Sequence, residues 1–295
     1  MSEYQYYEFL AVDHPLDERQ LAEVRALSTR ATVTATRFVN EYHWGDFRGD
    51  PARLMELYYD AHLYLANWGT RRVMLRLPRS MLDVDVAEQY CLNEQVAAWI
   101  SGEDLVLDLV SEDEADEFVD DAGGSLAAIA GVRAEIAAGD LRALYVAWLA
   151  GFGTWERDEH TFAPEVDEEL EPPVPAGLRT RTAAQQALAD FLRLDGDLLD
   201  VAARASPELE MVADDPDTLA TWVASVSSAE KDRLLARVLQ GHAATVRTQL
   251  LRRFHAEAGT PSASEPQRTV ADLLDAAAGQ RAERKRSTAA RHAAK

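Results

Sequence analysis

An acid-x-histidine pair, Glu41 and His43, lies in a β-branched and aromatic run that predicts extended chain over residues 29–44. Residues two apart on a strand project from the same face. The two side chains are therefore placed to hold a metal ion together, or to act as a base and its orienting acid. Arg37 lies further along that face. A zinc site needs a third ligand, and no cysteine or histidine cluster supplies one, so no bound metal is expected.

A second acid-x-histidine pair, Asp60 and His62, falls in a segment that predicts a helix over residues 50–67. On a helix, residues two apart point about 200° from each other. These two side chains cannot then serve one ligand, and His62 is expected at the edge of the helix core.

Arginines gather near Trp68. Arg72 and Arg76 lie on the same face of a strand predicted over residues 73–77. A phosphate or carboxylate ligand suits guanidinium groups, which bind both bidentately. The alternative is ion pairing with carboxylates of the chain itself. The candidate ligand-binding residues are Arg37, Glu41, His43, Trp68, Arg72 and Arg76.

The chain is strongly acidic, with 51 acidic and 30 basic residues and a formal net charge of −21. This charge repels nucleic-acid phosphates and anionic membranes from most of the surface. A nucleic-acid contact is expected only at the basic tail, residues 281–295, which also has the alternative of folding back on the chain's own acidic linker. No apolar run approaches the ~18 residues that span a bilayer. Cys91 has no partner for a disulfide, and a cytoplasmic location is expected.

The periodicities predict an α+β fold. The expected structure is an N-terminal mixed sheet of about five strands with two packed helices, ferredoxin-like or related. An all-α region and a long charged C-terminal helix follow it. The expected strands occupy residues 4–12, 29–44 with a bend near Arg37, 73–77, 96–101 and 105–110. The first is apolar on both alternate sets, which is typical of a central strand covered on both sides.

Composition also divides the chain. The predicted parts are a sheet domain over residues 1–110, an acidic linker over 111–121, a helical domain over 122–258 with an acidic loop over 153–175, and a flexible joint with a charged helical tail over 259–295. The tail carries no stop signal, which predicts that the chain continues as a coiled coil. Within the acidic loop, the segment 155–160 (WERDEH) offers a metal-binding or lid function, with a solvated loop as the alternative.

Three sequence blocks, YQYYEFLAVD, FVNEYHWGDFRGDP and DAHLYLANWGTRRVMLRLPR, resemble a conserved, uncharacterised family of bacterial proteins of actinobacterial type. The similarity covers the first domain closely and the helical part more loosely. The resemblance implies a cytosolic protein with a charged helical tail. It carries over no activity, cofactor or site residue.

Two functions from different classes remain. The sequence has no glycine-rich phosphate loop, no nucleophile elbow and no zinc signature, so no cofactor is expected. This favours a non-enzymatic interaction or adaptor protein that docks a protein partner through its helical region and tail. The alternative is an enzyme or small-molecule sensor with an anion-binding pocket on the sheet domain.

Overall fold

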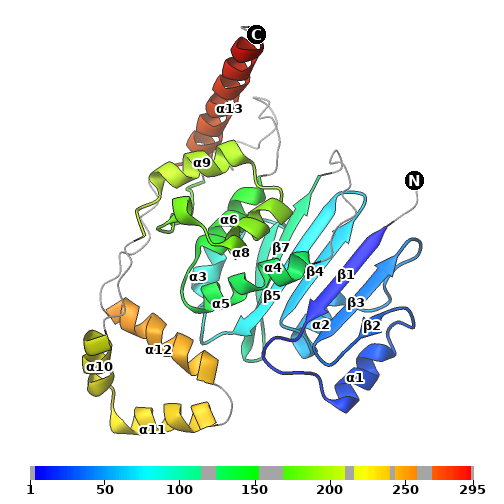
Figure 1. Ribbon diagram of the computed structural model, residues 1–295, viewed down its shortest axis with the longest axis vertical. Helices are drawn as coiled ribbons and strands as arrows, with labels where there is room; N and C mark the ends of the chain where they lie inside the picture. Colours follow the sequence, from blue (N-terminus) through cyan, green and yellow to red (C-terminus); the bar gives the residue numbers. More distant parts are fainter. Residues whose placement is uncertain are drawn as a thin grey trace.

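The computed structural model describes residues 4–113, 124–152, 169–209, 216–239, 243–257 and 268–293. Its centre is a seven-stranded sheet in the order β2-β3-β1-β4-β5-β7-β6, shown in Figure 1. The strands are β1 (Gln5–Leu10), β2 (Thr32–Val33), β3 (Arg37–Tyr42), β4 (Ala61–Ala66), β5 (Thr70–Pro78), β6 (Val96–Ser101) and β7 (Asp104–Glu112). The predicted α+β class is confirmed. The predicted mixed five-stranded sheet of ferredoxin-like type is wrong in detail, because there are two more strands and every pairing among these seven is antiparallel.

β1 lies inside the sheet, between β3 and β4, as its sequence predicts. Tyr7 and Phe9 are buried on one face, and Tyr6 and Glu8 are buried on the other. A strand covered on both sides must be apolar on both alternate sets. The long run that follows breaks as expected, since β2 and β3 are separated by a turn in which the Thr34 hydroxyl accepts from the Arg37 amide at 3.0 Å.

The helix predicted over residues 50–67 is wrong in its second half. α2 (Pro51–Leu57) begins as expected, with the Asp50 carboxylate accepting from the Ala52 amide at 2.9 Å and proline at the first position. The chain leaves helical geometry at Tyr58, and residues 61–66 form β4. The segment AHLYLA is apolar at spacings that suit either a helix or a doubly covered strand. Pairing with β1 and β5, both distant in sequence, decides for the strand.

Helices cover both faces of the sheet (Figure 1). One face packs against α1 (Glu18–Arg25) and α2, through Leu16, Val24, Leu54, Met55 and Tyr59. The other face packs against the all-α region that was predicted after the sheet. Its helices there are α3 (Val84–Glu88), α4 (Ser125–Ile129), α5 (Gly131–Ala137), α6 (Arg142–Ala150) and α8 (Ala183–Phe191).

The larger apolar core runs without a break from Tyr6 in the sheet to Ala277 near the C-terminus. It therefore crosses the predicted domain boundary at residue 110, and the division into separate domains stays a prediction. Parts of the predicted acidic linker and acidic loop, including the segment 155–160, and the joint at 259–267 lie outside the described residues.

The C-terminal helix is confirmed as α13 (Val270–Ala293), and it packs along α9 (Gly196–Ala205). A short 3-10 turn, η1 (Leu178–Thr180), precedes α8. The helices α10 (Pro216–Ser225), α11 (Ser228–Arg237) and α12 (Ala243–Glu257) follow α9 in the chain. Within the described residues, no helix has the length and apolar character required to cross a membrane.

Candidate functional site

The three candidate residues near β3 lie on one face of the sheet, and the two candidate arginines of β5, Arg72 and Arg76, lie on the other. Arg37 stands opposite Leu10 in β1, which stands opposite Ala61 in β4. Residues paired directly across antiparallel strands share a face, so Arg37 faces the side of the larger core. Glu41 follows Arg37 at an even spacing and shares its face. The structure therefore does not bring the six candidates into one pocket.

Arg37 is bound to a carboxylate of the chain. Its Nε lies 2.7 Å from an oxygen of Glu8, a side chain that is only 2% exposed. The Tyr6 hydroxyl donates to the same carboxylate at 2.9 Å. A buried carboxylate needs such partners, because an unpaired charge in the interior is very costly. Glu41 and His43 are exposed, and the ring of His43 lies 5.5 Å from that of Tyr4.

The arginines of β5 are also paired within the chain. Arg72 stands opposite Tyr64 and donates to both carboxylate oxygens of Asp108, at 2.7 and 2.5 Å. Arg76 donates to the carboxylate of Asp60 at 2.8 Å. Trp68 lies between β4 and β5 in a turn and is 43% exposed. Each of these two guanidinium groups thus already has a carboxylate partner.

His62, predicted at the edge of a helix, lies fully buried in the middle of β4. Its ring stacks on Phe9, with 3.9 Å between the ring centroids. Nδ1 lies 2.9 Å from the Glu8 carbonyl oxygen, so Nδ1 carries the proton and donates it, and Nε2 has no partner among the described residues. Burial lowers the pKa of His62 from 6.5 to about 3. The neutral imidazole packs within the core, and its burial leaves no room for a ligand to reach it.

A polar cavity of about 710 Å³ opens at the end of the sheet where β1 finishes and β4 begins. We call it the sheet-end cavity. Its charged lining residues are Asp13, Asp60, Glu103, Asp104, Arg76, Arg79, Arg133 and Arg237, together with His14. Four carboxylates thus face four guanidinium groups, and one of the predicted candidates, Arg76, is among them.

Most of these charges form one paired network. Asp60 is 2% exposed and accepts from the amides of Val12 and Asp13 at 2.6 and 2.9 Å. Arg133, from α5, donates to both oxygens of Asp13 and to the carbonyl of Arg76. Burial raises the pKa of Asp104, whose carboxylate lies 3.9 Å from Arg76. The network ties the β1–α1 loop to the helical layer. Across the described residues, no His, Cys, Asp and Glu cluster is suited to a metal ion.

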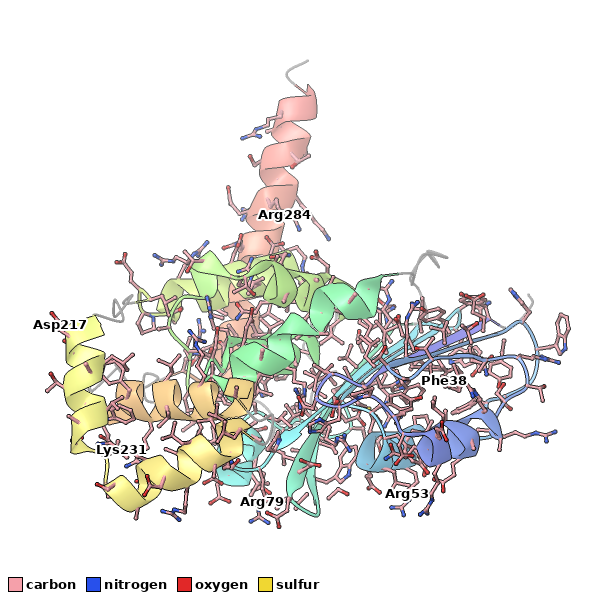
Figure 2. All side chains as sticks on the ribbon, turned by 60° about the horizontal axis from the view of Figure 1, so that its bottom comes forward. Phe38, Arg53, Arg79, Asp217, Lys231 and Arg284 are labelled. Carbon is pink, nitrogen blue, oxygen red and sulfur yellow. The ribbon has the colours of Figure 1, made fainter. Side chains whose placement is uncertain are left out.

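The helices α10, α11 and α12 form a group beside the sheet, which we call the helical arm (Figure 1), and Arg237 of α11 also lines the sheet-end cavity. Figure 2 shows Asp217 and Lys231 of the arm far from Phe38 in the sheet. No residue of α11 is buried. Leu235 of α11 and the two residues that follow the helix, Val238 and Leu239, are 62%, 36% and 89% exposed. Their spacing of three and four residues places them on one side of the helix, and we call them the α11 stripe.

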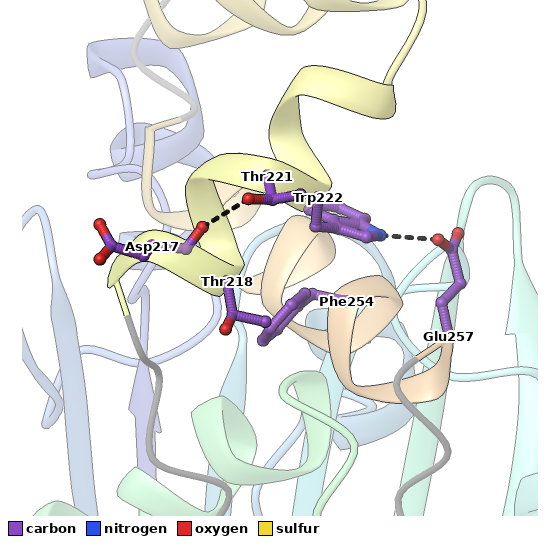
Figure 3. A pocket seen from close by; sticks show the side chains of 6 residues that line it. All are labelled: Asp217, Thr218, Thr221, Trp222, Phe254 and Glu257. Carbon is purple, nitrogen blue, oxygen red and sulfur yellow. Dashed lines mark hydrogen bonds between the residues drawn. The ribbon is translucent and has the colours of Figure 1, made fainter.

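A second feature of the arm is a hollow of about 520 Å³ between α10 and α12, which we call the arm pocket. It is lined by Asp217, Thr218, Thr221, Trp222, Phe254 and Glu257, shown in Figure 3. The indole of Trp222 donates to Glu257 at 2.6 Å and meets the Phe254 ring edge-on, with 5.6 Å between the centroids. Sequence reasoning missed this pocket. The sequence offers a tryptophan in α10 and a phenylalanine in α12 as the signal for it.

The basic tail is partly neutralised by the chain itself. Arg281 lies 2.8 Å from a carboxylate oxygen of Asp195, and Arg284 lies 2.6 Å from one of Asp197. Arg284 is labelled on the projecting helix in Figure 2. Both acidic residues belong to the start of α9, whose first turn favours negative charge. Arg281 and Arg284, both in the basic tail predicted to contact nucleic acid, therefore also hold α13 on α9.

Comparisons with protein-family models, with curated proteins and with solved structures find no match to this chain. The resemblance to an actinobacterial family stays a prediction. The molecule is thus defined by its own features, an α+β body with an antiparallel sheet, paired internal charges and a thinly packed helical arm.

Proposed function

We propose that this protein is a non-enzymatic adaptor that docks a partner protein through the α11 stripe. The observation that carries the proposal is the exposure of Leu235, Val238 and Leu239 at the C-terminal end of α11, a helix that buries none of its residues. Single exposed apolar residues are normal, whereas a contiguous exposed patch marks an interaction surface. Helices that display apolar residues three and four apart commonly bind in an apolar groove of a partner.

Burying the apolar side chains of the α11 stripe supplies enough free energy to support binding. Burying one leucine side chain contributes about 1.5–3 kcal/mol. Two leucines and a valine therefore supply several kilocalories before the cost of ordering the complex is subtracted. The partner's contacting surface is expected to be apolar and concave. The net charge of −21 favours a protein partner over a nucleic acid, because it repels polyanions.

The proposal is tested by placing a photo-cross-linking amino acid at position 239 and irradiating source cells. We expect a cross-link to a distinct protein, which mass spectrometry identifies. That protein, once purified, is expected to bind the wild type and to lose at least about tenfold in affinity for the double variant Leu235→Ser with Leu239→Ser, since 1.4 kcal/mol corresponds to tenfold.

The matched control is Ile100→Ser, which removes an exposed apolar residue (45% exposed) from the sheet. It should bind the partner like the wild type. Cross-links that join only copies of this chain, or an unchanged affinity of the double variant, would overturn the adaptor proposal.

The sheet-end cavity favours a second candidate function, the binding of a small anionic molecule. Its volume of about 710 Å³ lies in the range of ligand sites. Arg79 is exposed at its lining, and among the described residues no carboxylate is paired with it. Figure 2 labels Arg79 together with Arg53 of α2.

This second function is tested by thermal unfolding with added citrate or inorganic phosphate. A saturable rise in the unfolding temperature is expected for the wild type and for Arg53→Gln, and a smaller rise for Arg79→Gln. Equal shifts in all three proteins would show a general salt effect and would sink the proposal.

A further inference from the structure

The arm pocket combines an aromatic surface with carboxylates. Trp222 and Phe254 supply the rings, and Asp217 and Glu257 supply the carboxylates. Figure 3 shows these groups around one hollow, with the Trp222 indole aimed at the Glu257 carboxylate. Among the described residues that line it, none is a cation. A cation placed against an indole face is attracted by the ring electrons, and a nearby carboxylate adds a charge-assisted hydrogen bond.

A cation of the chain itself, Arg253, makes contacts of this kind beside the pocket. The guanidinium carbon of Arg253 lies 6.0 Å from the centroid of the Trp222 ring. Arg253 also donates to Glu257 at 3.1 Å and to Glu230 at 2.6 Å. The hydrogen bonds from Trp222 and Arg253 lower the pKa of Glu257, so its carboxylate stays ionised at neutral pH. Among the described residues that line the pocket, two are acidic and none is basic.

We infer that the arm pocket binds an arginine or lysine side chain presented by the partner polypeptide. The inference rests on the proposed adaptor function and adds the chemistry of the partner, a basic residue next to an apolar segment. Charge complementarity selects this occupant, because a net negative and aromatic hollow disfavours acidic side chains and gives a neutral one no charge-assisted bond. The pocket and the α11 stripe both belong to the helical arm.

The direct test uses the full chain labelled with ¹⁵N at its tryptophan indoles. The Trp222 signal is assigned by its loss in Trp222→Phe. An acetylated and amidated peptide, Ala-Ala-Arg-Ala-Ala, is titrated against the protein, and the same peptide with citrulline replacing arginine is the neutral isostere. We expect the arginine peptide to move the Trp222 indole signal saturably and the citrulline peptide to leave it in place.

Glu257→Gln keeps a hydrogen-bond acceptor for the indole and removes the charge. This variant is expected to lower the affinity for the arginine peptide at least about threefold, in line with the energies of exposed cation–π contacts and ion pairs. Glu18→Gln, an equal loss of charge from the exposed first turn of α1, should change nothing. No shift with the arginine peptide, or equal shifts with both peptides, would overturn the inference. If free arginine amide bound as tightly as the peptide, the claim that the occupant belongs to a polypeptide would be overturned.

The two proposals fail separately. If the peptide leaves Trp222 unmoved while Leu235→Ser with Leu239→Ser still abolishes partner binding, the pocket inference falls and the adaptor stands. If the partner identified by cross-linking at position 239 binds Glu257→Gln as tightly as the wild type, the pocket is not part of that complex and the inference is likewise refuted.

Discussion

The buried histidine of β4 makes the stability of this protein depend on pH in a defined way. In the unfolded chain His62 titrates near 6.5, whereas burial lowers its pKa to about 3 in the folded protein. Between these values the unfolded state binds a proton that the folded state does not bind. Stability therefore rises with pH across this window, and it falls as the pH is lowered from 6.5 towards 3.

The magnitude follows from the two pKa values. One pKa unit corresponds to about 1.36 kcal/mol. At pH 4.5 the unfolded state has gained the proton over two units, so His62 alone lowers the free energy of unfolding by about 2.7 kcal/mol relative to pH 7.5. The physical reason is visible in the structure, because a proton on Nε2 would lie among aromatic rings with no described acceptor.

The assay is urea unfolding followed by circular dichroism at pH 7.5, 6.0 and 4.5, for the wild type and for His62→Phe. Phenylalanine fits a position stacked on Phe9 and cannot be protonated. We expect the variant to lose about 2.7 kcal/mol less than the wild type over this range, since all other titrating groups are shared. His43→Gln, a surface replacement, should keep the wild-type dependence. Parallel curves for the wild type and His62→Phe would show that the imidazole is not held neutral.

Further predictions test the ion pairs and the tail. Asp60→Ala should lower the free energy of unfolding by about 3–5 kcal/mol, because the half-buried Arg76 loses its carboxylate partner and the amides of Val12 and Asp13 lose their acceptor. Asp104→Asn in the same cavity should cost nothing or stabilise at neutral pH, because burial raises the pKa of Asp104 and disfavours its ionised form, and equal losses in urea unfolding would contradict this. Glu171→Gln should loosen α13 and speed its proteolysis, because the Glu171 carboxylate holds Arg268 at 2.7 Å; unchanged cleavage would contradict it. Truncation after Arg284 should leave the unfolding temperature unchanged, since residues 285–291 are exposed, and a clear fall would show that the tail packs.

Local signals predicted the parts of the fold that depend on short-range physics. Both alternate sets of β1 are apolar, and that pattern alone indicated a covered strand. Asp17 and Gln20, three residues apart at the start of α1, form a capping box with both of its hydrogen bonds present. The strands expected over residues 96–101 and 105–110 are present as β6 and β7, which pair across the short turn between them. In each case the residues that decide the structure are neighbours in the chain.

The segment 58–66 shows where such reasoning ends. Its apolar residues fit a helical stripe and a doubly covered strand equally well, and helix propensity favours neither strongly. The backbone hydrogen bonds that decide for β4 come from β1 and β5, so they depend on pairing with chain segments far away in sequence.

The candidate site divides in the same way. The sequence alone determined that arginines and carboxylates are abundant around the sheet, and that Glu41 and Arg37 share a face of one strand. Only the tertiary structure decided that Arg72 lies on the opposite face, because a strand's face relative to another strand depends on sheet order and register. It also decided which apolar residues remain exposed. An amphipathic pattern shows that Leu235 and Leu239 share one side of a helix, whereas their exposure depends on what packs against that side, and this is a property of the folded chain.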